Sequence, residues 1–412
     1  MTAPRSSRWL SHNAAALVPK EGIEPTYPKV HDFESCASAS SATSALPQLY
    51  MKLGIIGLPQ SGKTTIFNAL TGGSKPVGQM AAGGRFEVTQ AVVNVPDGRV
   101  DKLSAMFKPK KTIYAQVNYA DIAGLEEGAG KSGFSGPLLN QLALMDGFIH
   151  VVRAFENAAV PHPGGSVNPQ RDMSVMETDL LLNDLVAVER KLEKLADELR
   201  KGGVKDKTAA QREQTLFTKL HDALSAEKPL REIELAAEDQ KSLSSQSFLT
   251  QKPLLTVINI GDDDKEDVAV GNRFHAHTVV LRGRLEMEIA QLSTEDAQAF
   301  LSEYNIAEPS LRRMIKLSYD LLGLQSFFTV GEDEVRAWTV RRGATAPEAA
   351  GEIHTDLREG FIRAEVFGYD DLMEAGDVHE VKAKGKFKLE GKEYVVKDGD
   401  VLNIRFSPPA KK

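Results

Sequence analysis

The sequence predicts an α/β protein with three parts: a domain with a mostly parallel sheet, an inserted antiparallel helical arm, and a small C-terminal β-grasp-like module. Three observations support this prediction. An apolar run at 53–56 enters a glycine-rich turn and then a helix-like segment. Leucines from 181 onward recur at alternating spacings of four and three residues. From about residue 324 the chain consists of short β-like runs separated by turn residues.

The glycine-rich turn has the spacing of a phosphate-binding loop. Residues 53–65 are LGIIGLPQSGKTT, which matches the G-x4-G-K-T pattern. The backbone N–H groups of such a loop surround phosphates, its lysine neutralises their charge, and the following helix directs its positive end at the same anion. The threonine hydroxyl would bind Mg²⁺. The expected phosphate-binding residues are Gly57, Pro59, Gln60, Ser61, Gly62, Lys63, Thr64, Thr65 and, from a second motif, Gly124.

That second motif is DIAG at 121–124, and the alternating run Tyr114 to Ala120 predicts a strand leading into it. Asp121 would contact Mg²⁺ through water, and the Gly124 N–H would sense the terminal phosphate. Many GTPases carry a glutamine at the next position to align the attacking water. Leu125 cannot form that hydrogen bond, so we expect hydrolysis to be slow or to be organised by another group, and we assign no catalytic residue.

Two further apolar runs, 147–152 and 253–258, predict buried parallel strands. The second ends at the position where many GTPases carry Asn-Lys-x-Asp to bind guanine. Ile260 replaces the lysine, which weakens the case for guanine. Asp262 either accepts hydrogen bonds from the base or is a solvated turn residue, and both interpretations stay open. The expected base-side residues are Asn259, Ile260, Asp262, Arg282 and Gly283.

The leucine repeat predicts a helical hairpin. The first stripe comprises Leu181, Leu185, Val188, Leu192, Leu195 and Leu199. Gly202 and Gly203 interrupt it, and a similar stripe resumes at Leu216, so an antiparallel arm of roughly 40 Å is expected. Its basic residues either contact RNA or form an ordinary solvated face. These residues are Arg190, Lys191, Lys194, Arg200, Lys201, Lys205 and Lys207.

In the C-terminal part, predicted strands cover 334–340, 362–366, 394–396 and 401–406. Lysines at 382, 384, 386 and 388 alternate as on one face of a strand. They would either meet phosphates or protect an edge strand, and the second interpretation is favoured.

Composition limits the remaining choices. The chain has 412 residues, a net charge of −7 and a pI of about 5.8, so it is not a polycation built for nucleic acid. Its one cysteine, Cys36, excludes an internal disulfide framework and is consistent with a cytoplasmic protein. We find no apolar run long enough to cross a bilayer and nothing that implies an oligomer. Residues 1–50, rich in Ser, Ala and Pro, are expected to be a disordered extension.

From Met51 to its end, the chain resembles the YchF-type Obg-like ATPase family, a branch of the translation-factor P-loop GTPases. The resemblance rests on GLPQSGKTTIFNAL (57–70), VVNVPDGRVDKL (92–103), KPKKT (108–112), DIAGL (121–125), IHVVRAFEN (149–157) and the stretch from LGLQSFFTV to IRAEV (322–366). It implies a P-loop G domain at 51–172 and 249–323, a coiled-coil insertion at 173–248 and a TGS domain at 324–408.

The resemblance also implies hydrolysis of ATP in preference to GTP, with Mg²⁺, and association with the ribosome or RNA through the arm and TGS domain. The family's base motif is Asn-x-x-Glu; Asn259 carries over, while Asp262 stands where glutamate is usual. Arg85 stands where the family's first switch has its magnesium-sensing threonine, with Thr89 as a substitute, and 132–137 departs from the second switch. The sequence therefore predicts a P-loop NTPase of slow turnover, the alternative being a non-catalytic, nucleotide-gated ribosome- or RNA-binding protein.

Overall fold

The structure, a computed structural model, describes residues 51–73, 88–122, 134–202, 206–264, 277–303, 306 and 308–407. Several sequence predictions lie outside these residues: the extension at 1–50, the switch position Arg85, the phosphate-sensing Gly124 with the neighbouring Leu125, and Lys205 of the arm.

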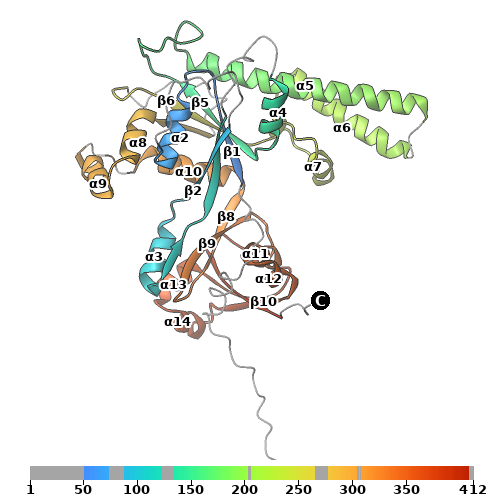
Figure 1. Ribbon diagram of the computed structural model, residues 1–412. Helices are drawn as coiled ribbons and strands as arrows, with labels where there is room; N and C mark the ends of the chain where they lie inside the picture. The colour runs from blue at the N-terminus through green and yellow to red at the C-terminus, as the bar shows by residue number, and fades with distance from the viewer. Residues whose placement is uncertain are drawn as a thin grey trace, which may run out of the picture.

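The first of two sheets has the strand order β2-β4-β1-β5-β6-β7 (Figure 1). Its strands are β1 (Lys52–Ile56), β2 (Val88–Asn94), β4 (Gln116–Ile122), β5 (Gly147–Arg153), β6 (Leu254–Asn259) and β7 (Thr278–Leu281). All neighbouring pairs are parallel except β2 with β4. The predicted, mostly parallel sheet is therefore confirmed, with β4 beginning two residues later than its alternating pattern predicts.

Helices cover both faces of this sheet. They are α2 (Lys63–Thr71), α4 (Gly136–Ala143), α8 (Gly283–Ala290) and α10 (Ser310–Leu321), and α9 (Thr294–Glu303) packs against α8. Apolar residues of α2 and α10 share one buried cluster with alternate residues of β1, β5 and β6. Residues of α4 and of the first turns of α5 (Pro169–Lys201) pack with Phe148 on the opposite face of β5. Because parallel strands buried on both faces end at one edge, the loops that follow β1, β4 and β6 meet there.

The predicted helical arm is present. It comprises α5 (Pro169–Lys201), α6 (Lys207–Ser225), the 3₁₀ turn η2 (Leu230–Glu232) and α7 (Ala237–Leu243). Figure 1 shows α5 and α6 side by side, projecting from the sheet. Leu181, Val188, Leu216 and Leu220 form the buried seam between them, as the repeat predicts. The basic residues Lys191, Lys194, Arg200 and Lys201 each lie within ion-pair distance of an acidic residue of the arm.

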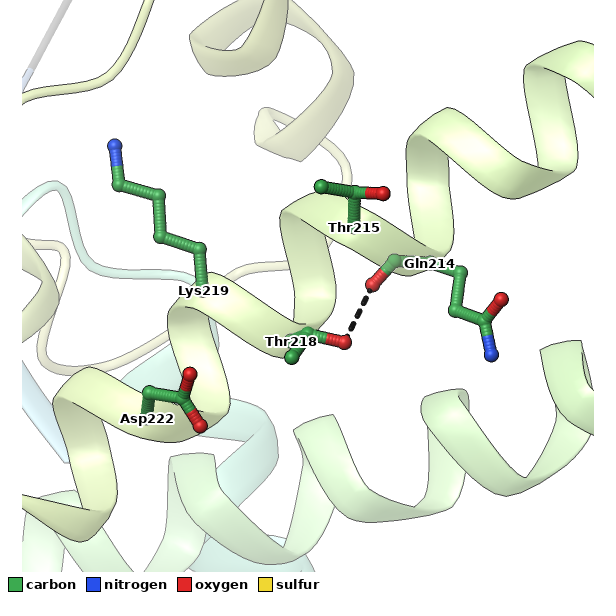
Figure 2. A pocket seen from close by; sticks show the side chains of 5 residues that line it. All are labelled: Gln214, Thr215, Thr218, Lys219 and Asp222. Atoms are coloured by element: carbon green, nitrogen blue, oxygen red, sulfur yellow. Dashed lines mark hydrogen bonds between the residues drawn. The ribbon is translucent and has the colours of Figure 1, made fainter.

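An open groove of about 470 Å³ lies on α6 (Figure 2). Its lining is formed by Gln214, Thr215, Thr218, Lys219 and Asp222. Thr218 donates its hydroxyl hydrogen to the Gln214 carbonyl, and Lys219 donates to the carbonyl of Glu234. No residue of the phosphate loop lines this groove, so it is a feature of the arm surface and not the expected nucleotide site.

The second sheet has the order β11-β10-β12-β8-β9-β3. Its strands are β3 (Lys111–Ile113), β8 (Leu324–Thr329), β9 (Glu334–Arg341), β10 (Phe361–Gly368), β11 (Lys388–Glu390) and β12 (Asp400–Phe406). The helices around it are α11 (Ala346–Ile353), α12 (Thr355–Glu359), α13 (Tyr369–Ala375) and α14 (Val378–Ala383).

Two sequence predictions in this sheet are wrong. The predicted strand at 394–396 is only an isolated bridge between Val395 and Thr345. The four alternating lysines do not share a strand face, because Lys382 lies in helix α14, Lys384 ends that helix, and only Lys388 belongs to a strand. A turn of helix and a short strand therefore replace the predicted lysine edge.

The two sheets are fused. Strand β3, which follows α3 (Gly98–Phe107), adds to the second sheet beside β9 although it lies in the chain between β2 and β4. One buried cluster joins Leu53 and Tyr119 of the first sheet to Phe328 and Val335 of the second. The C-terminal sheet is therefore fixed to the first one by shared core packing.

Candidate nucleotide-binding site

The loop between β1 and α2 has the backbone that its glycines predict. Gly57 has φ of 151° and Gly62 has φ of 98°, both in the region that favours glycine. A Cβ atom on Gly57 would lie 2.3 Å from the carbonyl oxygen of Val151, so a side chain does not fit there. The helix α2 begins at Lys63 and has no side-chain cap. The positive end of the α2 dipole is therefore directed at this loop, where an anion would bind.

The polar side chains of this loop are directed at the same turn. Lys63 Nζ donates to the carbonyl oxygens of Gly57 and Leu58, each at 3.0 Å. The Ser61 hydroxyl is buried and has no hydrogen-bond partner among the described residues. The loop thus holds an ammonium group and an unused hydroxyl beside an uncapped helix start, which is the chemistry that binds a polyphosphate.

Thr64 and Asp121 meet next to this loop. The Thr64 hydroxyl donates to Asp121 Oδ2 at 3.1 Å, and Asp121 is only 2% exposed. Thr89 of β2 lies opposite Asp121 in the sheet. Among the described residues there is no cluster of three or more His, Cys, Asp or Glu that could hold a metal by itself. Oxygen atoms from these side chains suit Mg²⁺, which keeps several ligands from water and phosphate.

Asn259 links the phosphate loop to the base-side loops. Its Nδ2 donates to the Ser61 carbonyl at 3.1 Å, and its Oδ1 accepts from the Gly283 N–H at 2.9 Å. A Cβ atom on Gly62 would lie 2.2 Å from Nδ2. The structure therefore brings together three segments that the sequence predicts to bind phosphate and base.

The other base-side residues differ in orientation. Ile260 is 3% exposed and packs in a cluster with Val152 and Met173, so its side chain faces the core. Arg282 donates to the carbonyl oxygens of Asp262 and Asp264 and thereby fixes the loop at 261–264. The side chain of Asp262 is 42% exposed.

Comparison with known proteins identifies the chain. Residues 52–176 match the model of a "50S ribosome-binding GTPase" family, and residues 324–407 match YchF-GTPase_C, described as a "Protein of unknown function (DUF933)". The chain is 40% identical over 368 residues to "Ribosome-binding ATPase YchF" of Bacillus subtilis, covering 86% of this chain and 98% of that protein. This chain belongs to the YchF family.

More distant YchF relatives agree. "Obg-like ATPase 1" of Homo sapiens is 36% identical over 376 residues, covering 87% of this chain and 93% of that protein. The solved structure of the Schizosaccharomyces pombe YchF GTPase superposes with a TM-score of 0.74 at 30% identity, covering 88% of this chain and 99% of that one. The resemblance drawn from the motifs and the predicted fold class are both confirmed.

One segment that carried the YchF resemblance, 149–157, holds two residues to which the sequence analysis gave no role. His150 is 4% exposed in β5, and burial together with the positive charges of Lys63 and Arg231 lowers its pKa to about 3. It is therefore a neutral imidazole behind the phosphate loop. No local pattern distinguishes it from an ordinary strand residue.

The second residue is Arg153, which lies opposite Asn259 in the sheet and is 2% exposed. It donates to the carbonyl oxygens of Phe155 and Val160 and packs over the Phe155 ring, with its Cζ 4.6 Å from the ring centroid. Burial lowers the pKa of this guanidinium. Arg153 thereby fixes the segment that follows β5 beside Gly261 of the base-side loop.

Among the residues that the structure describes, no helix combines the length and the apolar character needed to cross a bilayer.

Proposed function

We propose that this member of the YchF family is a P-loop NTPase that hydrolyses ATP, with GTP as the alternative substrate, and uses the nucleotide to switch its binding to the ribosome. One observation carries the proposal. The Lys63 ammonium, the buried Ser61 hydroxyl and the contact between Thr64 and Asp121 converge on one strand-to-helix loop. These groups are matched to a triphosphate with its metal.

In this proposal Lys63 exchanges its carbonyl partners for phosphate oxygens, because hydrogen bonds between charged groups are stronger than those to neutral carbonyls. The backbone N–H groups of the loop and of the first turn of α2 bind the remaining oxygens. The phosphate-binding residues are Gly57, Pro59, Gln60, Ser61, Gly62, Lys63, Thr64 and Thr65, with Gly124 as the expected sensor of the terminal phosphate.

Mg²⁺ fits this site because Thr64 and Asp121 present hydroxyl and carboxylate oxygens at one point. Thr64 would hold the ion from the first turn of α2, and Asp121 from the end of β4. When bound, the ion neutralises charge on the outer phosphates. Thr89, opposite Asp121 in β2, offers a further hydroxyl. We assign no water-activating residue and expect slow turnover.

The base would lie at the loops after β6 and β7. Asn259 and the backbone of Gly283 form the edge nearest the phosphate loop. Asp262, fixed through the backbone by Arg282, is the acidic side chain available to the base. Ile260 supports this loop from the core.

The proposed partner is the ribosome, because bacterial relatives are named ribosome-binding ATPases. We propose contacts through the coiled-coil arm at 173–248 and the TGS domain at 324–408, with RNA as the ligand. The G domain would comprise 51–172 and 249–323. We also propose a cytoplasmic location, which is consistent with a ribosome as partner.

Turnover of ATP and GTP by the full chain, with Lys63→Ala beside it, tests the proposal. We expect slow, Mg²⁺-dependent phosphate release that falls at least tenfold in Lys63→Ala. Lys102→Ala, an exposed lysine on α3, is the matched control and should retain the full rate. Nucleotide binding without phosphate release that depends on Lys63 would instead support the non-catalytic, nucleotide-gated alternative.

A competition titration measures whether the protein prefers an adenine or a guanine nucleotide. Labelled ATP bound to the protein is displaced by unlabelled ATP or GTP, and the ratio of the two affinities is read directly. A large preference for ATP would support the proposal that this protein is an ATPase. A preference for GTP would reject ATP as its main substrate.

A further inference from the structure

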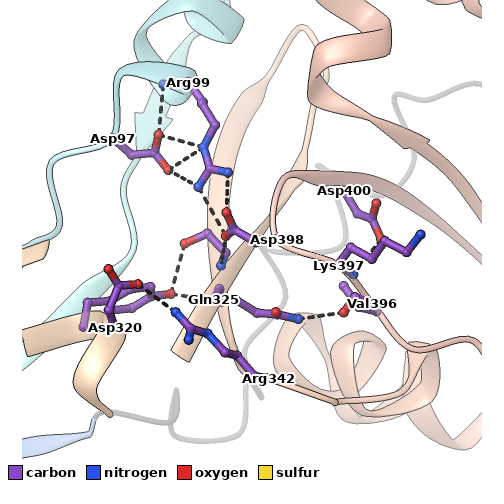
Figure 3. Close-up of polar contacts among 11 residues, drawn as sticks. Asp97, Arg99, Asp320, Gln325, Arg342, Val396, Lys397, Asp398 and Asp400 are labelled. Atoms are coloured by element: carbon purple, nitrogen blue, oxygen red, sulfur yellow. Dashed lines mark hydrogen bonds and ion pairs between the residues drawn. The ribbon is translucent and has the colours of Figure 1, made fainter. Parts of the chain in front are cut away.

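The guanidinium of Arg99 contacts both the segment that follows β2 and the C-terminal sheet (Figure 3). Arg99, in the first turn of α3, contacts Asp97 through Nε and Nη2 at 3.0 and 2.8 Å, and contacts Asp398 through Nη1 at 2.7 Å. Asp398 in turn accepts from the Ser326 N–H of β8 at 3.0 Å. The edge nitrogens of one planar guanidinium thus hold Asp97 and Asp398 together.

The surroundings restrict this arginine to one orientation. Asp97 caps α3 by accepting from the Arg99 N–H, and Arg99 Cζ lies 5.0 Å from the ring centroid of Phe328. Although burial opposes it, hydrogen bonds from Arg99 and Ser326 keep the pKa of Asp398 below its ordinary value. Gly399 has φ of 88°, and a Cβ atom there would lie 3.1 Å from Arg99 Nη1. The backbone of the turn at 397–400 therefore packs directly against the guanidinium of Arg99, so a shift of the guanidinium would also shift the turn.

The strand that leads to Arg99 starts at the proposed metal site. Thr89 of β2 lies opposite Asp121, and Asn94 at the far end of β2 lies opposite Gln116. The ladder continues where the Val95 N–H donates to the Ala115 carbonyl at 2.7 Å. The segment from Thr89 to Asp97 is thus a continuous extended connection of roughly 25 Å. Figure 1 shows β2 and β4 running from the first sheet toward α3 and the C-terminal sheet.

We propose that Arg99 couples occupancy of the nucleotide site to the 397–400 turn of the C-terminal sheet. This inference rests on the proposed function. A nucleotide that changes the hydrogen bonding of Asp121 also changes that of the β2–β4 ladder at Thr89. Because the two sheets share one core, the result at the far end is a local shift at Asp97 and Arg99, not a domain swing. Coupling is reciprocal, so the turn also influences nucleotide affinity.

Amide hydrogen exchange on the full chain tests the coupling. The probe is Mg²⁺ with a non-hydrolysable ATP or GTP analogue, and the amide to follow is that of Gly399, which donates to the Ser326 carbonyl. We expect nucleotide to change its exchange rate by about fivefold in the unsubstituted protein. In Arg99→Gln and in Asp398→Asn the nucleotide still binds, but this response falls below twofold. Arg99→Lys restores only part of it, because lysine lacks the planar fork.

Arg342→Gln is the matched control. Arg342 pairs with Asp320 of α10 at 3.0 Å and also joins the two parts of the molecule, but it lies off the β2–β4 ladder (Figure 3). Its response should equal that of the unsubstituted protein. The proposal is overturned if bound nucleotide leaves Gly399 unchanged, if Arg99→Gln responds fully, or if Arg342→Gln loses the response to the same degree. A protein that binds no nucleotide at all rejects the proposed function and, with it, this coupling.

Discussion

The hydroxyl of Thr64 donates a hydrogen bond to Oδ2 of Asp121 over 3.1 Å. The two residues are 57 positions apart in the chain and come from the start of α2 and the end of β4. Parallel strands bring these ends to one edge of the sheet. The fold itself therefore holds the Thr64 hydroxyl and the Asp121 carboxylate together beside the phosphate loop.

Removing the Thr64 hydroxyl should weaken nucleotide binding only when Mg²⁺ is present. Thr64→Val keeps the shape of the side chain but removes its oxygen, so we expect a loss of about tenfold or more in affinity for the Mg²⁺ complex. Thr64→Ser keeps the oxygen and should bind almost normally. Calorimetric titration with Mg²⁺ and with EDTA separates the two effects. Equal affinity of Thr64→Val and the unsubstituted protein for the Mg²⁺ complex would contradict the assignment.

Gly62→Ala should destabilise the fold as well as the site. Its φ of 98° is strained for alanine, and the new Cβ would lie 2.2 Å from Asn259 Nδ2. We expect the free energy of unfolding to fall by about 1–3 kcal/mol, measured by urea denaturation. Gly98→Ala is the control, since nothing lies within 4 Å of a Cβ atom there. A smaller loss for Gly62→Ala in an Asn259→Ala background would identify the clash as the cause.

Sequence reasoning succeeded where the signal is local. The phosphate loop follows from glycine spacing, the arm from a leucine repeat, and two buried strands from the apolar runs at 147–152 and 253–258, which the structure reproduces to within one residue at each end as β5 and β6. Each of these depends on residues within one or two turns of each other. In the arm, the apolar residues repeat regularly because one face of each helix is buried.

It failed where distant segments decide the structure. Strand β3 has three residues, two of them exposed, and exists only because β9 offers an edge. The lysines at 382–388 alternate by chance across a helix end, a loop and the first residue of β11. The contact between Arg99 and Asp398 joins positions 299 residues apart. No periodic pattern encodes such a contact, and only packing of the two sheets produces it.

His150 should make stability depend on pH. Its pKa is about 3 in the folded protein and about 6.5 when unfolded, so below pH 6.5 the unfolded chain binds the extra proton. The free energy of unfolding therefore falls by about 1.4 kcal/mol per pH unit, or about 2 kcal/mol by pH 5. His150→Gln lacks this contribution. Between pH 7.5 and 5, the free energy of unfolding of the unsubstituted protein should therefore fall by about 2 kcal/mol more than that of His150→Gln.

The control is His379→Gln, because the His379 imidazole is exposed on α14 and lacks the burial on which this prediction rests. Denaturant unfolding at each pH gives the slopes. Identical slopes for His150→Gln and the unsubstituted protein would mean that the imidazole becomes protonated without loss of structure.

Asp184 of α5 joins the helical arm to residues 249–250. It is 1% exposed in α5 and accepts from the N–H of Leu249, the N–H of Thr250 and the hydroxyl of Thr250, at 3.0, 2.7 and 2.7 Å. Asp184→Ala leaves these buried donors without an acceptor, so we expect a loss of about 3 kcal/mol or more in the free energy of unfolding. The Leu249 and Thr250 amides should also lose protection from hydrogen exchange.

The exposed Asp197, whose partners on α5 are Arg200 and Lys201, provides the comparison. Asp197→Ala breaks two surface ion pairs and should change the free energy of unfolding by less than about 0.5 kcal/mol. If both substitutions had similar small effects, the Asp184 carboxylate would not be what joins the arm to the segment that precedes β6. If only Asp184→Ala is costly, the arm is anchored at residues 249–250, in the segment that leads into the strand carrying Asn259.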